Sequence, residues 1–178
     1  MRADPKELIR LPLFRHLPLS ALAPLVSACP LIEVERGACV IHEGTPGDSA
    51  LLLVAGRLQA TTALGGCRLG ITLPGDIVGE RALLERSPTR SARLVALDPA
   101  RLLLVQPATL RALEGSLVGL ALELAVLRGV SDHLRSSTKA LVALPPQRAA
   151  EFEAPTAPQA EAPTFRLPSA GRRGQVSL

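Results

Sequence analysis

The stretch LPGDIVGERALLERSPTRSARLVAL, residues 73–97, decides how the rest of the chain is interpreted. It contains a Pro-Gly-Asp turn, a Gly-Glu pair, a short apolar run and, ten residues after the glutamate, the sequence Arg-Ser-Ala. Residues 78–88 lack the alternation of a strand, and ERALLE is typical of one helical turn. The stretch therefore predicts a helical turn inserted into a β region, with Glu80 and Arg90 near its two ends.

Short apolar runs continue on both sides of this stretch, from about residue 30 to residue 107. They are separated every eight to twelve positions by turn segments such as EGTPGD, GG and PGD. Even spacing with this punctuation is typical of all-β barrels and rolls. We therefore expect a mainly β fold with flanking helices, in which 30–107 form a β-roll of the double-stranded β-helix or jelly-roll type.

Helical patterns flank the β region. Residues 1–29 contain recurring leucines interrupted by prolines, which predicts two or three short N-terminal helices. Residues 108–144 predict one long C-terminal helix, because leucines recur alternately four and three positions apart, as in a coiled-coil stripe. These leucines stand at positions 113, 117, 120, 124, 127, 134 and 141. One helix cannot bury such a stripe alone, so we expect it to pack on the roll, on a second copy through 113–141, or on both.

The last segment, residues 145–178, has no apolar period and contains six prolines. This composition predicts a disordered tail, whose candidate docking points are Phe152 and Phe165-Arg166-Leu167. Because no further pair of helices follows the long helix, we expect no direct binding of nucleic acid. An unidentified protein is the expected effector.

The composition excludes several classes of protein. The chain has 178 residues, 47% of them apolar, and a net charge of +4 with acidic and basic residues interleaved, so it lacks a basic stripe for a phosphate backbone. The N-terminus carries charges and no apolar signal core. The most apolar helical segment contains Glu123 and Arg128, which excludes a membrane span. A cytoplasmic location is therefore expected.

The sequence also lacks the usual signs of catalysis and metal binding. Cys29, Cys39 and Cys67 stand at no metal-ligand spacing, and we expect them to be reduced residues of the core. The histidines, at positions 16, 42 and 133, are isolated and receive no function. Since neither a catalytic constellation nor a phosphate loop is present, we expect no enzyme activity and no metal.

Two stretches together resemble the cyclic nucleotide-binding domain family, which includes the catabolite activator protein and the regulatory parts of cyclic-nucleotide-dependent kinases. The first is GACVIHEGTPGDSALLLVAGRL, residues 37–58, and the second is residues 73–97. The second resembles the phosphate-binding cassette of the family, here over 79–92. The resemblance covers roughly residues 7–143 and implies cAMP or cGMP as ligand, with the choice left open.

The residues of the cassette suit the two polar ends of such a ligand. Arg90 offers a guanidinium fork for the phosphate, and Glu80 can accept a hydrogen bond from the ribose 2′-hydroxyl. Gly79 allows close backbone approach. The full predicted ligand-binding set is Gly79, Glu80, Arg81, Ala82, Arg90, Ser91 and Ala92. The resemblance further implies a base-capping residue on the long helix, for which the candidates are Arg135, Ser136 and Ser137.

Two further pairs of residues in the first stretch are expected to form turns rather than to contact the ligand. Glu43 with Gly44 and Gly47 with Asp48 are interpreted as turn residues. The cassette departs from the family at Val78, where an aromatic residue is often found, and at Arg81, where an aliphatic one is common.

Three functional hypotheses follow. The first is a stand-alone cyclic nucleotide sensor that repositions its C-terminal helix. The second is a dimerisation or scaffold module that keeps the fold without the ligand, which the two departures favour. The third is a transcription factor that lacks its DNA-binding domain.

Overall fold

The computed structural model describes residues 1–62, 68–85 and 88–142. The chain divides into a unit of residues 1–140 and a unit of residues 141–178. The predicted disordered tail, including Phe152 and Phe165-Arg166-Leu167, lies outside the described residues, as does Cys67.

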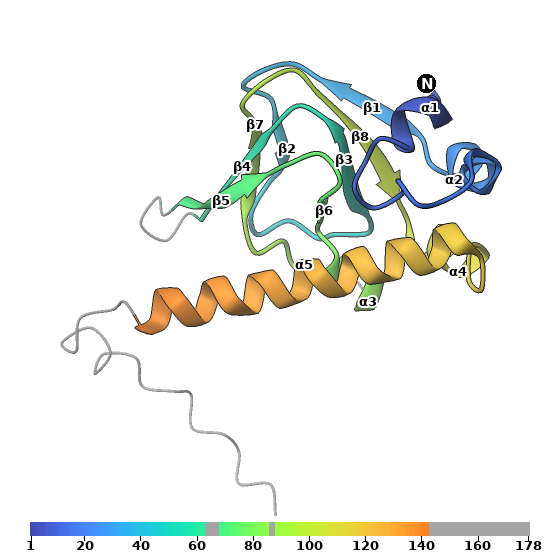
Figure 1. Ribbon diagram of the computed structural model, residues 1–178. Helices are drawn as coiled ribbons and strands as arrows, with labels where there is room; N and C mark the ends of the chain where they lie inside the picture. The colour runs from blue at the N-terminus through green and yellow to red at the C-terminus, as the bar shows by residue number, and fades with distance from the viewer. Residues whose placement is uncertain (63–67, 86–87, 143–178) are drawn as a thin grey trace, which may run out of the picture. The chain divides into compact units, whose positions relative to one another are not determined.

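The described part of the chain contains two four-stranded antiparallel sheets, which confirms the predicted β-roll (Figure 1). One sheet has the order β1-β8-β3-β6 and the other has the order β2-β7-β4-β5. The bounds are β1 Leu31–Val34, β2 Cys39–Ile41, β3 Ala50–Ala55, β4 Leu58–Thr61, β5 Arg68–Thr72, β6 Ile77–Val78, β7 Arg93–Ala96 and β8 Ala100–Val105.

The central strands β3 and β8 contribute side chains to a core on each face, which explains why both are apolar apart from Arg101 in β8. Leu53 pairs with Leu102, and both belong to the cluster that fills the roll. Their neighbours Leu52 and Leu103 also pair, but they belong to the cluster that includes the N-terminal helices. Because successive side chains of a strand point to opposite faces, one pair of strands supports two cores.

The N-terminal segment forms short helices, as its prolines predict. They are α1 Pro5–Leu8, the 3₁₀ helix η1 Leu19–Leu22 and α2 Ala23–Ala28. Asp4 caps α1 by accepting a hydrogen bond from the Lys6 N–H at 2.8 Å. Leu8 and Leu25 of these helices and Phe14 of the turn between them are fully buried, so this segment covers the outer face of β3 and β8.

The prediction of a single helix over 108–144 was wrong at its start. The structure has α4 Pro107–Ala112, a turn in which Gly115 has a φ of +74°, and then α5 Leu117–Val142. The Ser116 hydroxyl accepts a hydrogen bond from the Gly119 N–H at 3.0 Å, which begins α5 with an N-cap. Leu113 lies before this break and is buried in the core, so it does not belong to the row of leucines on the long helix, as the sequence had predicted it would.

Helix α5 has two apolar faces. One face packs on the roll through Val118, Leu122, Ala125 and Val126, which are buried, and the last two contact Ala50 and Ile77. The other face carries five leucines that are between 49% and 65% exposed: Leu117, Leu120, Leu124, Leu127 and Leu134. Figure 1 shows α5 running past β6 and α3. We call these five residues the leucine stripe.

Candidate functional site

The predicted helical turn is present between β6 and β7. It is α3, Arg81–Leu84, and it follows Gly79, whose φ of +72° turns the chain out of β6. The Ala82 N–H donates to the Gly79 carbonyl at 3.0 Å, and Ala82 is buried. A residue with a β-carbon is strained at this φ, so glycine allows the sharp change from strand to helix.

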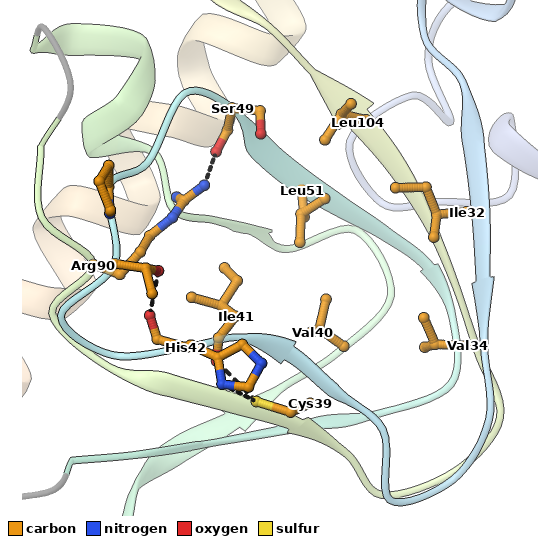
Figure 2. Close-up of a pocket in the computed structure, with 12 residues that line it drawn as sticks. Ile32, Val34, Cys39, Val40, Ile41, His42, Ser49, Leu51, Arg90 and Leu104 are labelled. Atoms are coloured by element: carbon orange, nitrogen blue, oxygen red, sulfur yellow. Dashed lines mark hydrogen bonds between the residues drawn. The ribbon is translucent and has the colours of Figure 1, made fainter.

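The Arg90 guanidinium lies against the start of this turn (Figure 2). Its Nη2 donates to the Ser49 carbonyl at 2.6 Å, and its Nη1 donates to the Gly79 carbonyl at 3.4 Å. Partial burial lowers the pKa of Arg90, while the carboxylates of Asp48 and Glu80 act in the opposite direction. An arginine keeps its proton under such conditions, so the site holds a cation that donates hydrogen bonds to two neutral carbonyls.

Two glycines make room for this side chain. A β-carbon at Gly47 would lie 2.6 Å from Nε of Arg90, and one at Gly79 would overlap Nη1. Both positions are closer to the guanidinium than ordinary van der Waals contact allows. Arg90 can therefore take this position only because neither Gly47 nor Gly79 has a side chain. The interpretation of Gly47 as a turn residue therefore missed its contact with the candidate site.

The Glu80 side chain is buried beneath α5. Glu80 is only 3% exposed and stands at the N-cap position of α3. A β-carbon on Gly129 of α5 would lie 4.0 Å from Cδ of Glu80 and 3.4 Å from the Ile77 carbonyl. These distances place the backbone of α5 at Gly129 next to Glu80 and Ile77, so α5 and the cassette meet there.

Other predicted residues lie away from this centre. Arg81 is exposed and forms an ion pair with Glu85 at 2.8 Å. Ser91 is exposed, and Ala92 is half-buried against the core of the roll. The structure thus brings together Gly79, Glu80 and Arg90 from the predicted set, but not the Arg81 side chain.

The predicted base-capping residues lie further along α5 than the contact with the cassette. The Arg135 side chain is 75% exposed and lies 3.8 Å from the Asp132 carboxylate. It follows Gly129 by six residues, which is about 9 Å along a helix axis. The side chains of Ser136 and Ser137 lie outside the described residues.

A cavity of about 350 Å³ opens beside Arg90 (Figure 2). Its apolar walls come from β1, β2, β3 and β8, and include Ile32, Val34, Ile41, Leu51 and Leu104. Its polar lining includes Cys39, His42, Thr45, Ser49 and Arg90. An apolar cavity with a few convergent polar groups is the usual form of a small-molecule site.

Sequence reasoning did not find the wall that β2 contributes. Cys39 is half-buried on this wall rather than in the core, whereas Cys29 is buried as expected. An apolar or thiol side chain gives no sign in the sequence of whether it faces a core or a cavity, so only the fold distinguishes the two.

The described residues offer neither a metal site nor a membrane-spanning helix. In residues 1–62, 68–85 and 88–142, no group of three or more His, Cys, Asp or Glu side chains is arranged to hold a metal ion. Within the same ranges, no helix has the length and hydropathy needed to cross a membrane.

Comparison with known proteins identifies related domains. Residues 31–116 match the sequence profile of the family described as cyclic nucleotide-binding domain. The acetyltransferase Pat of Mycolicibacterium smegmatis is 37% identical over 82 residues, which are 45% of this chain and 24% of that protein. The chain therefore spans about a quarter of the length of this relative.

Solved structures agree with this assignment. The N-terminal domain of a transcriptional regulator from Streptomyces coelicolor is 29% identical, with a TM-score of 0.52 over 76% of this chain and 94% of that one. A cyclic nucleotide-binding domain from Methylobacillus flagellatus gives a TM-score of 0.60 at 20% identity, covering 77% of this chain and 79% of its own. The second likeness shows that the two share a fold.

Proposed function

The chain carries a domain of the cyclic nucleotide-binding family, and from that premise we propose that it is a regulatory module that binds cAMP or cGMP in the cytoplasm. In this proposal it has no catalytic step of its own. Its role is to convert the presence of the nucleotide into a change in α5 that an effector protein detects.

The observation that carries the proposal is the state of Arg90. Its guanidinium lines the cavity, is partly buried and donates to the neutral carbonyls of Ser49 and Gly79. A phosphodiester anion is a much stronger acceptor than a carbonyl, and it matches the fork of the guanidinium. The cyclic phosphate therefore replaces these carbonyls as the partner of Arg90.

Glu80 supplies the second polar contact of the proposed site. Glu80 is only 3% exposed, and burying a carboxylate costs free energy unless it has a polar partner. In this proposal, it accepts a hydrogen bond from the ribose 2′-hydroxyl of the nucleotide. The pair of residues then selects a ligand that has an anion at one end and a hydroxyl at the other.

Transmission of the signal follows from the contact between Glu80 and α5. Gly129 of α5 lies against Glu80 and Ile77, so a ligand that changes the position of Glu80 also changes the surface on which α5 rests. A ligand shifts such an equilibrium only by its difference in affinity for the two arrangements. We place that difference in the contact between Gly129 and Glu80.

The decisive experiment is calorimetric titration of the full chain with cAMP and with cGMP. We expect at least one nucleotide to bind, and the Arg90→Ala variant to lose about 100-fold in affinity, since hydrogen bonds to charged groups contribute roughly 1.5–3 kcal/mol each. Arg93→Ala is the matched control, because Arg93 is an exposed residue of β7 in the same segment. Equal affinities of the Arg90 and Arg93 variants would contradict the proposal.

A second candidate is a dimerisation or scaffold module that binds no nucleotide. One observation favours it: both terminal nitrogens of Arg90 already have acceptors within the protein. Under this hypothesis neither nucleotide gives heat or raises the melting temperature, while the leucine stripe still brings two chains together. Ligands that bind only the folded state always raise its stability, so a thermal shift separates the two candidates.

A further inference from the structure

The cavity wall formed by β2 carries a thiol beside an imidazole. The Cys39 Sγ lies 3.5 Å from Nδ1 of His42, and the thiol also donates a hydrogen bond to the Ile41 carbonyl at 3.2 Å. Cys39 is half-buried and His42 is exposed, and both line the cavity that contains Arg90. Figure 2 shows the sulfur and the ring adjacent to one another.

This arrangement has the geometry of an activated nucleophile. A nucleophilic side chain within hydrogen-bond reach of a base is the usual sign that the base can take its proton. The cavity also gives a small reagent a path to the sulfur, and the Arg90 guanidinium contributes a positive charge to the same cavity. Thiols that react selectively are found in such partly exposed, electropositive surroundings.

Cys29 provides an internal contrast. It is 1% exposed in the core, and burial raises its pKa to about 11. A thiol that is both inaccessible and protonated at neutral pH is inert. Any reactivity of the described cysteines therefore belongs to Cys39.

We propose that Cys39 is a modification site, a nucleophilic thiol assisted by His42 that reacts with small electrophiles, with hydroperoxides as the oxidants. The proton of the thiol passes to His42, and the sulfur attacks one peroxide oxygen. The S–O bond forms to the terminal hydroxyl oxygen, the O–O bond breaks, and the second oxygen leaves as hydroxide or alkoxide, which the proton converts to water or an alcohol. The sulfur is oxidised by two electrons to the sulfenic acid, and the peroxide is reduced.

The location of the sulfur gives the modification a consequence, which rests on the proposed function. Because Cys39 and Arg90 line the same cavity, an adduct on the sulfur occupies space that the nucleotide needs. Modification of Cys39 therefore lowers nucleotide affinity. Oxidation of the thiol and binding of the nucleotide then both act at the same cavity.

The test is the rate at which iodoacetamide labels the full chain, followed by peptide mass spectrometry. Cys67→Ser is the parent variant, so that only Cys29 and Cys39 remain. We expect the label on Cys39 and none on Cys29. We expect His42→Gln to slow the labelling about fivefold, since the variant lacks the base that takes the proton of the thiol.

His16→Gln is the matched control for the histidine, because His16 is an exposed residue of the N-terminal segment. It should leave the rate unchanged, and Cys39→Ser should abolish the label. An unreactive Cys39, or a rate that His42→Gln leaves unchanged, would overturn the proposal. Treatment with hydrogen peroxide and dimedone should give a sulfenic acid adduct on Cys39, and its absence would overturn the oxidative step.

The consequence for the cavity is measured separately, by titrating cAMP and cGMP into the labelled protein. We expect a loss of at least about tenfold in affinity, as a bulky group excludes the ligand from its site. Equal affinity before and after labelling would overturn the blocking effect. If the unlabelled protein binds neither nucleotide, the proposed function fails, while the labelling rates still decide whether Cys39 is activated by His42.

Discussion

Gly47 contributes to the site because it has no side chain, which leaves space for Arg90. Arg90 lies so close to this residue that a single added carbon would stand 2.6 Å from Nε. The backbone of Gly47 has no positive φ, so glycine is not required there by its conformation. The space beside it is therefore the physical reason for glycine at this position.

This reasoning predicts the effect of Gly47→Ala. The methyl group displaces the guanidinium from the Ser49 carbonyl, and we expect a loss of about 10- to 100-fold in nucleotide affinity, since charge-assisted contacts depend strongly on geometry. Titration calorimetry measures the loss. Gly37→Ala is the control: its β-carbon meets nothing within 4 Å, but its φ of +85° is strained, so it should lower stability and leave affinity unchanged. The reverse pattern would contradict our account of Gly47.

At this scale the sequence predicts charged residues better than small ones. Arg90 and Glu80 were predicted because they stand in the stretch that resembles the family's cassette, whereas a Glu–Arg pair taken alone is more often a surface ion pair. Gly47 was missed because a glycine in a Gly-Asp turn looks the same whether or not another side chain lies against it. Cys39 was missed for a similar reason, since the strand pattern does not say which face borders a cavity.

Among the elements, the break between α4 and α5 changes the structure most. Leu113 and Leu117 are four residues apart, so the apolar period runs across the break and predicts a continuous helix. The helix is interrupted by Gly115, which has a left-handed backbone, and by Ser116, which caps the start of α5. Neither residue is apolar and at a leucine position, so the spacing of the leucines does not reveal the break. Strand β6 has only two residues, Ile77 and Val78, which are too few to show alternation in the sequence.

The two glycines inside α5 give opposite predictions. A β-carbon at Gly129 meets its neighbours at ordinary contact distances, so Gly129→Ala should raise the free energy of unfolding by about 0.5–1 kcal/mol through helix propensity. A β-carbon at Gly119 would overlap the Leu113 carbonyl, which is backbone and moves only at a cost, so Gly119→Ala should lower stability by about 1–3 kcal/mol. Chemical denaturation of the two variants checks both signs. Two changes of the same sign would refute the packing described for α5.

For the molecule as a whole, the leucine stripe predicts that two chains associate. Its five residues are between 49% and 65% exposed along one face of α5, an apolar surface that a second copy of the helix would cover in the predicted dimer. Leu124→Glu places a charge in the middle of that surface, and we expect it to convert dimer to monomer in light scattering. Leu84→Glu is the control, since Leu84 is 60% exposed on α3, outside the stripe. A monomeric parent chain would contradict the prediction.

Nucleotide binding should also be visible across the described chain. Hydrogen exchange should slow in α3, at the end of β6 and in the part of α5 near Gly129, because these segments meet at Glu80. The N-terminal helices pack in the core cluster that holds Val118 and Leu122, before Gly129 on α5, and they serve as the internal reference. Protection confined to the cassette, with none in α5, would show that the ligand binds without reaching the helix.

The two apolar faces of α5 also restrict how this helix can move. If it turned about its own axis, Leu122 and Val126 would be drawn into solvent, and stripe residues would have to fit against Ile77. A swing that keeps the same face toward the roll avoids this loss, and the left-handed turn at Gly115 provides a pivot at the near end. In such a swing about Gly115, a small displacement of α5 at Gly129, which lies next to Glu80 and about halfway along the helix, would become a larger displacement at the C-terminal end of the helix.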